Sequence, residues 1–113
     1  MHELSISLKT IDLVVEQAQK HHYRKVTKIT LSVGVLSCIE PEALRTGLEM
    51  ASRETIAQDA EVVIETLPAI AVCQGCRHQF AIENYQDSCP QCHSYQLTVQ
   101  QGEELQVKHI EVE

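Results

Sequence analysis

Four cysteines of this chain form two closely spaced pairs, a pattern typical of a metal site. Two residues lie between Cys73 and Cys76, two between Cys89 and Cys92, and twelve separate the pairs. A two-residue spacing lets one tight turn direct both sulfurs at a single point, and two such turns complete the tetrahedron that Zn(II) prefers. We therefore expect a zinc ion on these four thiolates, although iron in a rubredoxin-like site would fit the same ligands.

The predicted zinc is structural. Four thiolates leave no open coordination position for water or substrate, so the chain is not expected to be an enzyme. The segment around the pairs has Phe80 as its only phenylalanine and cannot bury enough apolar surface to fold alone, so metal binding would supply the stability. His78 and His93 lie close to the pairs. We interpret them as turn residues, with exchange against a thiolate as the alternative.

The remaining cysteine, Cys38, stands apart from the pairs. A free cysteine most often behaves as a small hydrophobic residue, so we expect its side chain to be buried. The alternative is a redox or metal-binding role.

The start of the chain carries a second candidate metal site. The α-amine of Met1, together with the backbone amide and the imidazole of His2, can chelate one ion in fused rings. The amide or a carboxylate of Glu3 could complete a planar set of donors, which suits Ni(II) or Cu(II). The alternative is a solvated histidine before a helix. Glu40 could add an oxygen ligand, although an acidic residue at a helix start more often interacts with the helix dipole.

Hydrophobic periodicity predicts the elements that position these residues. The first is a helix at the start of the chain, which ends near His21 and buries apolar residues spaced three or four apart. A second helix begins at Glu40-Pro41, with Gly47 allowing close approach to a neighbour. The predicted buried face of the first helix consists of Leu4, Leu8, Ile11, Val15 and Ala18, and that of the second consists of Leu44, Leu48 and Ala51.

Alternation of apolar and polar residues predicts the strands. Such alternation occurs over residues 29–35, 60–68, 95–99 and 105–107, and Gly102 suits a hairpin loop between the last two segments. The alternation changes phase near Lys108, which indicates a bulge. We expect the last strand to join the first sheet, which makes the cysteine segment an insertion.

The predicted fold class is therefore α+β, with a small sheet packed by two helices and an inserted zinc-ribbon-like domain. The expected domains are 1–68 plus 99–113, which would bind nickel, and 69–98, which would bind zinc.

Composition excludes several classes of partner. Nine lysines and arginines stand against 16 aspartates and glutamates, for a formal charge of −7, and this speaks against binding to nucleic-acid phosphates. Four aromatic residues offer few stacking platforms: Tyr23, Phe80, Tyr85 and Tyr95. The apolar run 69–73 is far too short to span a bilayer, and no signal peptide is evident. We expect a cytoplasmic protein.

Several motifs together resemble the HypA/HybF family of nickel metallochaperones for [NiFe]-hydrogenase maturation. The resemblance covers essentially the whole chain. Its motifs are Met1-His2-Glu3-Leu4, the segment 33–38, the two cysteine pairs with the Cys-Pro-x-Cys-His sequence of the second, Gly102-Glu103-Glu104-Leu105, and the tail 110–113.

The resemblance implies a role for each candidate metal residue. Nickel would bind as cargo at Met1, His2 and Glu3, with His2 as the indispensable side chain. Structural zinc would bind at the four paired cysteines. The implied partners are a HypB-type GTPase and the hydrogenase large-subunit precursor, with self-association into a homodimer left open. Some family members serve urease instead, and no residue here decides that. The alternative interpretation is a zinc-ribbon protein-interaction or regulatory module without nickel transfer.

Overall fold

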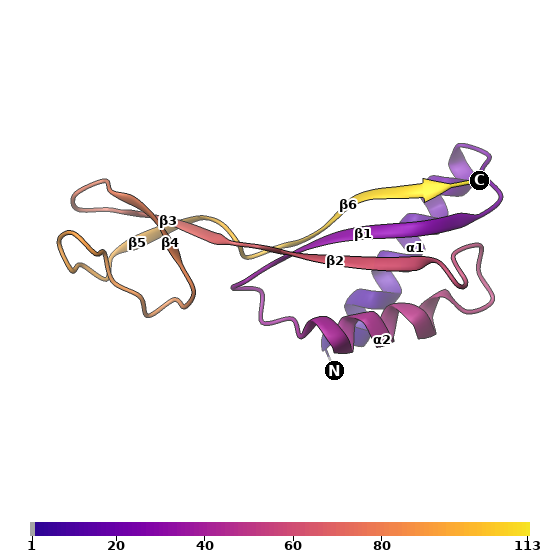
Figure 1. Cartoon of the computed structure of the whole chain (residues 1–113), viewed down its shortest axis with the longest axis horizontal. Helices are drawn as coiled ribbons and strands as arrows, with labels where there is room; N and C mark the ends of the chain where they lie inside the picture. The colour runs from indigo at the N-terminus through magenta and orange to yellow at the C-terminus, as the bar shows by residue number, and fades with distance from the viewer. Residues whose placement is uncertain (1) are drawn as a thin grey trace. The chain divides into compact units, whose positions relative to one another are not determined.

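The computed structural model describes residues 2–113, with side chains from Glu3 onward, and has the predicted α+β fold. One three-stranded sheet has the order β2-β1-β6 and the other the order β4-β3-β5 (Figure 1). No helix in the described part of the chain is long and apolar enough to cross a membrane. The elements are α1 (His2–Lys20), β1 (Val26–Gly34), α2 (Pro41–Ser52), β2 (Glu61–Leu67), β3 (Ala69–Cys73), β4 (Gln79–Ile82), β5 (Leu97–Gln101) and β6 (Leu105–Val112).

The chain divides into two compact units. The first unit consists of Met1–Leu31, Ile39–Glu65 and Gln106–Glu113, and the second of Ser32–Cys38 and Thr66–Leu105. The expected functional domains, 1–68 plus 99–113 and 69–98, stay a prediction, because compactness alone does not assign a metal to either unit.

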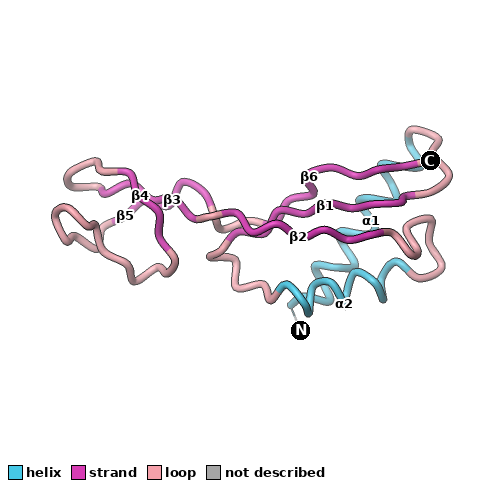
Figure 2. Tube along the Cα trace, in the orientation of Figure 1, coloured by secondary structure: helices cyan, strands magenta, loops and turns pink. Residues whose placement is uncertain are grey.

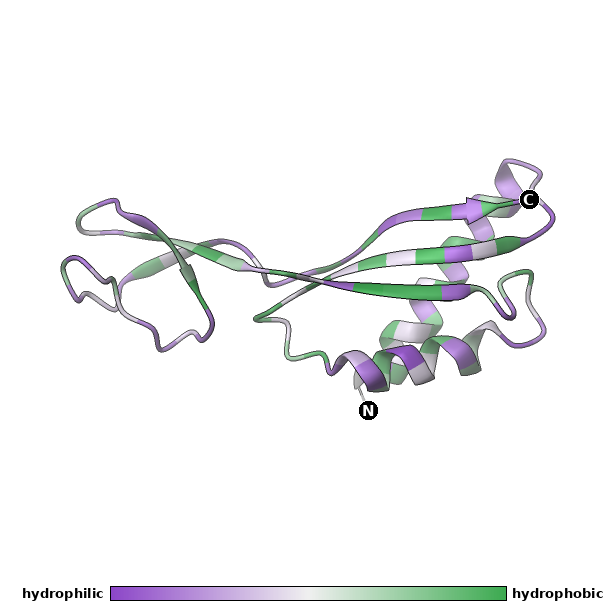
Figure 3. Ribbon diagram, in the orientation of Figure 1, coloured by the Kyte–Doolittle hydropathy of each residue, from purple (hydrophilic) through white to green (hydrophobic). Residues whose placement is uncertain are grey.

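In the first unit, α1 and α2 run in the same direction, and both cover one side of the strands (Figure 1). The start of α1 contacts the start of α2 at Glu3 and Glu40, and one turn later Ser7 contacts Leu44. Figure 3 shows hydrophobic residues along both β1 and β2, and those of β1 include the buried Ile29 and Leu31. The large side chains with less than 2% exposure in this unit are Ile11, Val14, Val26, Ile29, Leu31, Leu44 and Leu48.

The predicted buried face of α1 is wrong in its first half. Leu4 and Leu8 are exposed, whereas Ser7 is fully buried. The cause lies in α2, where a Cβ atom on Gly47 would come within 2.5 Å of the Ser7 hydroxyl. The two helix backbones are too close here for a leucine side chain, so the buried face of α1 contains the small polar residue Ser7 instead. The buried residues of α1 are Ser7, Thr10, Ile11, Val14 and Ala18.

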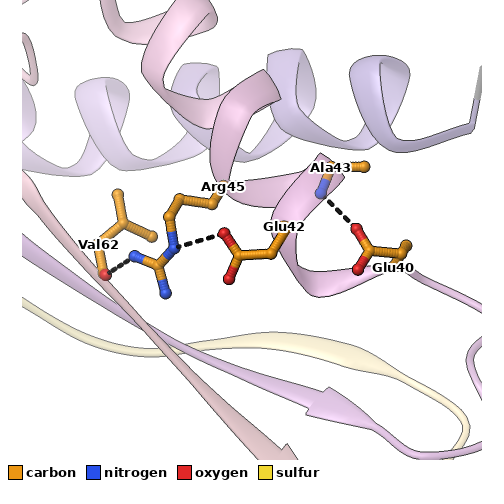
Figure 4. Close-up of polar contacts among 5 residues, drawn as sticks. All are labelled: Glu40, Glu42, Ala43, Arg45 and Val62. Carbon is orange, nitrogen blue, oxygen red and sulfur yellow. Dashed lines mark hydrogen bonds and ion pairs between the residues drawn. The ribbon is translucent and has the colours of Figure 1, made fainter.

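The start of α2 is stabilised by its own residues, as Figure 4 shows. Glu40 has extended backbone angles, and its carboxylate accepts a hydrogen bond from the Ala43 N–H at 2.6 Å, which makes it the N-cap. Pro41 occupies the first helical position, where a missing N–H costs nothing. Arg45 pairs with Glu42 and donates to the Val62 carbonyl, so α2 is also tied to β2.

The second unit is built around β3. This strand pairs antiparallel with β4, with Ala71 opposite Phe80, and with β5, with Cys73 opposite Leu97. Figure 2 shows that loops account for most of the chain between β4 and β5. The hydrophobic core of this sheet is small and consists of Leu36, Ala69, Ala71 and Ile82, with Phe80, Leu97 and Val99 packed against them.

The hairpin predicted at Gly102 is wrong, because β5 pairs with β3 while β6 joins β1, as expected for the last strand. Gly102 instead allows a close backbone crossing. Its φ of +106° is left-handed, and a Cβ there would lie 2.4 Å from the Ala69 Cα. A Cβ on Gly34 would lie 2.2 Å from the Gly102 carbonyl oxygen. In β6, burial changes phase at Lys108 and His109, as a bulge would produce.

Replacement of Gly102 by alanine should destabilise the second unit by about 2 kcal/mol or more, because left-handed backbone strain and a clash with Ala69 act together. Chemical denaturation of the zinc-loaded protein measures the loss. Gly75→Ala is the matched control, since a Cβ there meets only the Cys73 sulfur, at 3.8 Å. Equal stability of the two variants would contradict the crossing as described.

Candidate metal centre

The structure brings all four paired cysteines together. Their sulfur atoms all lie within 4.8 Å of one another, with 3.4 Å between Cys73 and Cys92 and 3.5 Å between Cys76 and Cys89. A tetrahedral zinc ion with Zn–S bonds of about 2.3 Å requires sulfurs separated by about 3.8 Å. The four thiols are free of disulfide bonds. Both the number of donors and their spacing therefore fit one tetrahedral ion.

Two turns of the same geometry carry these cysteines. In the first, the Cys73 carbonyl accepts from the Arg77 N–H at 3.0 Å, and Arg77 has a φ of +67°. In the second, the Cys89 carbonyl accepts from the His93 N–H at 2.9 Å, and His93 has a φ of +62°. The residue after each second cysteine thus turns the chain back in the left-handed conformation. The first turn joins β3 to β4, while the second lies in the long loop before β5.

The electrostatics of the cluster favour a cation. Backbone N–H groups in the first turn, that of Cys76 above all, lower the pKa of the Cys73 thiol to about 6 despite the opposing effect of burial. The His78 N–H acts in the same direction on Cys76, but burial and the neighbouring sulfurs outweigh it and raise the pKa of Cys76 to about 12. One thiol ionises readily and its neighbour resists, because clustered anions repel one another. A divalent cation would remove this conflict.

The two neighbouring histidines differ in their surroundings. The His78 ring stacks on Phe80, with 5.6 Å between the ring centroids and 13° between the ring planes, which favours a packing role. His93 is exposed and supplies the left-handed turn residue. Neither belongs to the group of candidate metal-binding side chains found in the described part of the chain, which consists of the four cysteines.

The expected burial of Cys38 is wrong. Its side chain is exposed, and its φ is +61°, in the loop between β1 and α2. Its thiol lies 3.8 Å from the Leu36 carbonyl oxygen. Its position in a connecting loop, outside the sheet and both helices, accompanies this exposure.

The predicted residues at the chain start are described in part. Met1 and the side chain of His2 lie outside the described residues, while the backbone of His2 opens α1. The Glu3 carboxylate accepts from the Glu40 N–H at 3.4 Å, so Glu40 does lie near this end. The Glu40 carboxylate, however, caps α2, which is the role that helix-dipole arguments favour. The contacts of Ser7 with Glu3 and Leu44 were not predicted from the sequence. The sequence indicated them only through the spacing of four residues between Glu3 and Ser7.

Comparison with known proteins gives concordant results. The family described as "Hydrogenase/urease nickel incorporation, metallochaperone, hypA" matches residues 1–112. The hydrogenase maturation factor HypA of Azotobacter chroococcum mcd 1 is 42% identical over 113 residues, with all of both chains covered. The hydrogenase maturation factor HybF of Salmonella typhimurium is 39% identical, again over the full length of both.

Two solved structures have the same fold. A solution structure of a HypA protein is 26% identical with a TM-score of 0.74, over 99% of this chain and 96% of that one. The solution structure of the nickel metallochaperone HypA from Helicobacter pylori is 24% identical with a TM-score of 0.73, over 97% and 96% of the two chains, and shows the fold alone. With its full-length relatives and its four-cysteine centre, this chain belongs to the HypA/HybF family of non-catalytic nickel metallochaperones for hydrogenase maturation.

Proposed function

We propose that this chaperone carries Ni(II) at its amino terminus, on the α-amine of Met1, the backbone amide and imidazole of His2, and a donor from Glu3. The observation that carries the proposal is that α1 begins at His2. The first N–H groups of an α-helix have no acceptor within the helix, so the amide nitrogens needed for chelation are not committed to its hydrogen bonds. Nitrogen and oxygen donors in this arrangement suit Ni(II).

The four-cysteine centre holds Zn(II) as a permanent structural ion in this proposal. A closed thiolate tetrahedron retains its metal and offers no position for exchange. The small core of the second unit supports a stabilising role, because four fully or nearly buried side chains give little hydrophobic stabilisation for its length. The proposal thus assigns the transferred nickel to the chain start and the structural zinc to the four cysteines.

Delivery completes the proposal. Working in the cytoplasm with a HypB-type GTPase, the protein passes nickel to the hydrogenase large-subunit precursor by ligand exchange at the chain start. The HypA and HybF names of the full-length relatives, both hydrogenase maturation factors, support this assignment. The rival function, a zinc-ribbon interaction module, would not require nickel binding. Whether the protein forms a homodimer is decided separately, by measuring its molecular mass in solution.

Substitution of His2 by alanine should weaken nickel binding by more than roughly 100-fold, because it removes a metal donor. Loss of a residue that only hydrogen-bonds to a metal ligand lowers the affinity less, by about 10- to 100-fold. Nickel titration of untagged, zinc-loaded protein, followed by absorption spectroscopy, measures the effect. His22→Ala is a matched control, since His22 is an exposed histidine at the far end of α1.

A short peptide added before Met1 should abolish tight nickel binding even with His2 intact, because it converts the amine into an amide. A rival interaction module would bind nickel equally in all these forms. That result would contradict the proposed cargo site.

Removal of zinc by a chelator, or substitution of the buried Cys89 by serine, should unfold the β4-β3-β5 sheet and leave the first unit folded. The first unit has its own larger core and supplies none of the four sulfurs. Amide resonances in a two-dimensional NMR spectrum report on each unit separately. Cys38→Ser is the matched control and should retain zinc, since Cys38 is exposed and outside the cluster. A zinc-free protein with both sheets intact would refute the structural role.

A further inference from the structure

The two helices of the first unit approach each other very closely at Gly47, beside the turn that contains Glu3. A Cβ atom on Gly47 of α2 would lie 2.5 Å from the Ser7 hydroxyl oxygen, 3.1 Å from the Ser7 Cβ and 3.5 Å from the Glu3 carbonyl oxygen. Ser7 is fully buried there. The bare backbone of α2 thus lies directly against the first two turns of α1, and no side chain fits at Gly47 without displacing Ser7.

A buried hydroxyl bridges the two helices at this contact. Ser7 Oγ lies 2.7 Å from the Glu3 carbonyl oxygen in its own helix and 3.4 Å from the Leu44 carbonyl oxygen in α2. One hydroxyl proton serves both acceptors, so the turn that contains Glu3 is connected to the backbone of α2. The hydrogen bond from the Glu40 N–H to the Glu3 carboxylate adds a second connection to the same residue.

A serine in a helix often bonds back to the carbonyl four residues earlier without further consequence. Two features distinguish Ser7 from that case. Its side chain has no solvent exposure, and its second acceptor belongs to another helix. Both the glycine opposite it and the hydroxyl itself are therefore required by the geometry of this contact.

We propose that Ser7, packed against Gly47, is a positioning residue for nickel binding. The inference rests on the proposed function. The first turn of a helix frays because its N–H groups lack helical partners, and any fraying at His2 and Glu3 must be reversed when their donors gather around one ion. By connecting the Glu3 turn to α2, Ser7 keeps this turn ordered before nickel arrives and lowers the entropy cost of binding.

The test compares two identical substitutions on one helix. Ser7→Ala removes the bridging hydroxyl, whereas Ser5→Ala is the matched control at an exposed position two residues away. Both untagged, zinc-loaded proteins are titrated with Ni(II) at a temperature where circular dichroism shows them folded. Ser7→Ala should bind nickel about tenfold more weakly than the control, which is the scale for losing a partner that orients metal ligands. Calorimetry should show this loss as a less favourable binding entropy, while the d–d absorption band at saturating nickel stays unchanged, because the same donors bind the ion in both proteins.

Gly47→Ala tests the same contact from the other helix without altering α1. The added methyl group displaces the Ser7 hydroxyl, so it should weaken nickel binding in the same direction even if Ser7→Ala does not fold. Affinity equal to that of Ser5→Ala, or an unaltered binding entropy, overturns the positioning role, while His2→Ala still reports on the cargo site. Equal binding by wild type and His2→Ala removes the proposed function and this inference together.

Discussion

Four thiolates within 4.8 Å of one another repel one another strongly unless a cation lies among them, and this is the constraint on which we propose that the second unit depends. Two turns with the same hydrogen bonds and the same left-handed residue direct the sulfurs inward. The sheet around them buries few large side chains. In the proposed zinc-bound protein, metal–sulfur bonds would stabilise this unit as hydrophobic burial stabilises the first.

The two proposed metal sites differ in how far their donors are committed to the fold. Each cysteine belongs to a turn closed by backbone hydrogen bonds, so loss of the ion would disturb the chain around it. The proposed nickel donors belong to the first three residues of the chain, and Glu3, the one whose side chain is described, is not among the buried residues. A carrier needs this difference, because one ion must stay when the other leaves.

Much of the fold could be predicted from local patterns, and the errors occur where one segment depends on another. Cysteine spacing predicted the cluster, and Glu40-Pro41 predicted the start of α2, because each signal is contained in a few neighbouring residues. The stripe through Leu4 and Leu8 was wrong because a glycine 40 residues away selects a small residue at Ser7. The hairpin at Gly102 was wrong because the need for a left-handed glycine came from a crossing with Ala69 and Gly34. Cys38 was predicted to be buried from its residue type alone, but it lies exposed in the loop between β1 and α2.

The parallel course of α1 and α2 has an electrostatic consequence. Contacts between Glu3 and Glu40 bring both helix starts to the same end of the first unit, so two positive dipole ends meet where the cargo is proposed to bind. Carboxylates in and before the first turns, those of Glu3, Glu40 and Glu42, offset this field. If nickel binds there as proposed, the peptide dipoles would oppose a divalent ion at that end, and the neighbouring carboxylates would favour it.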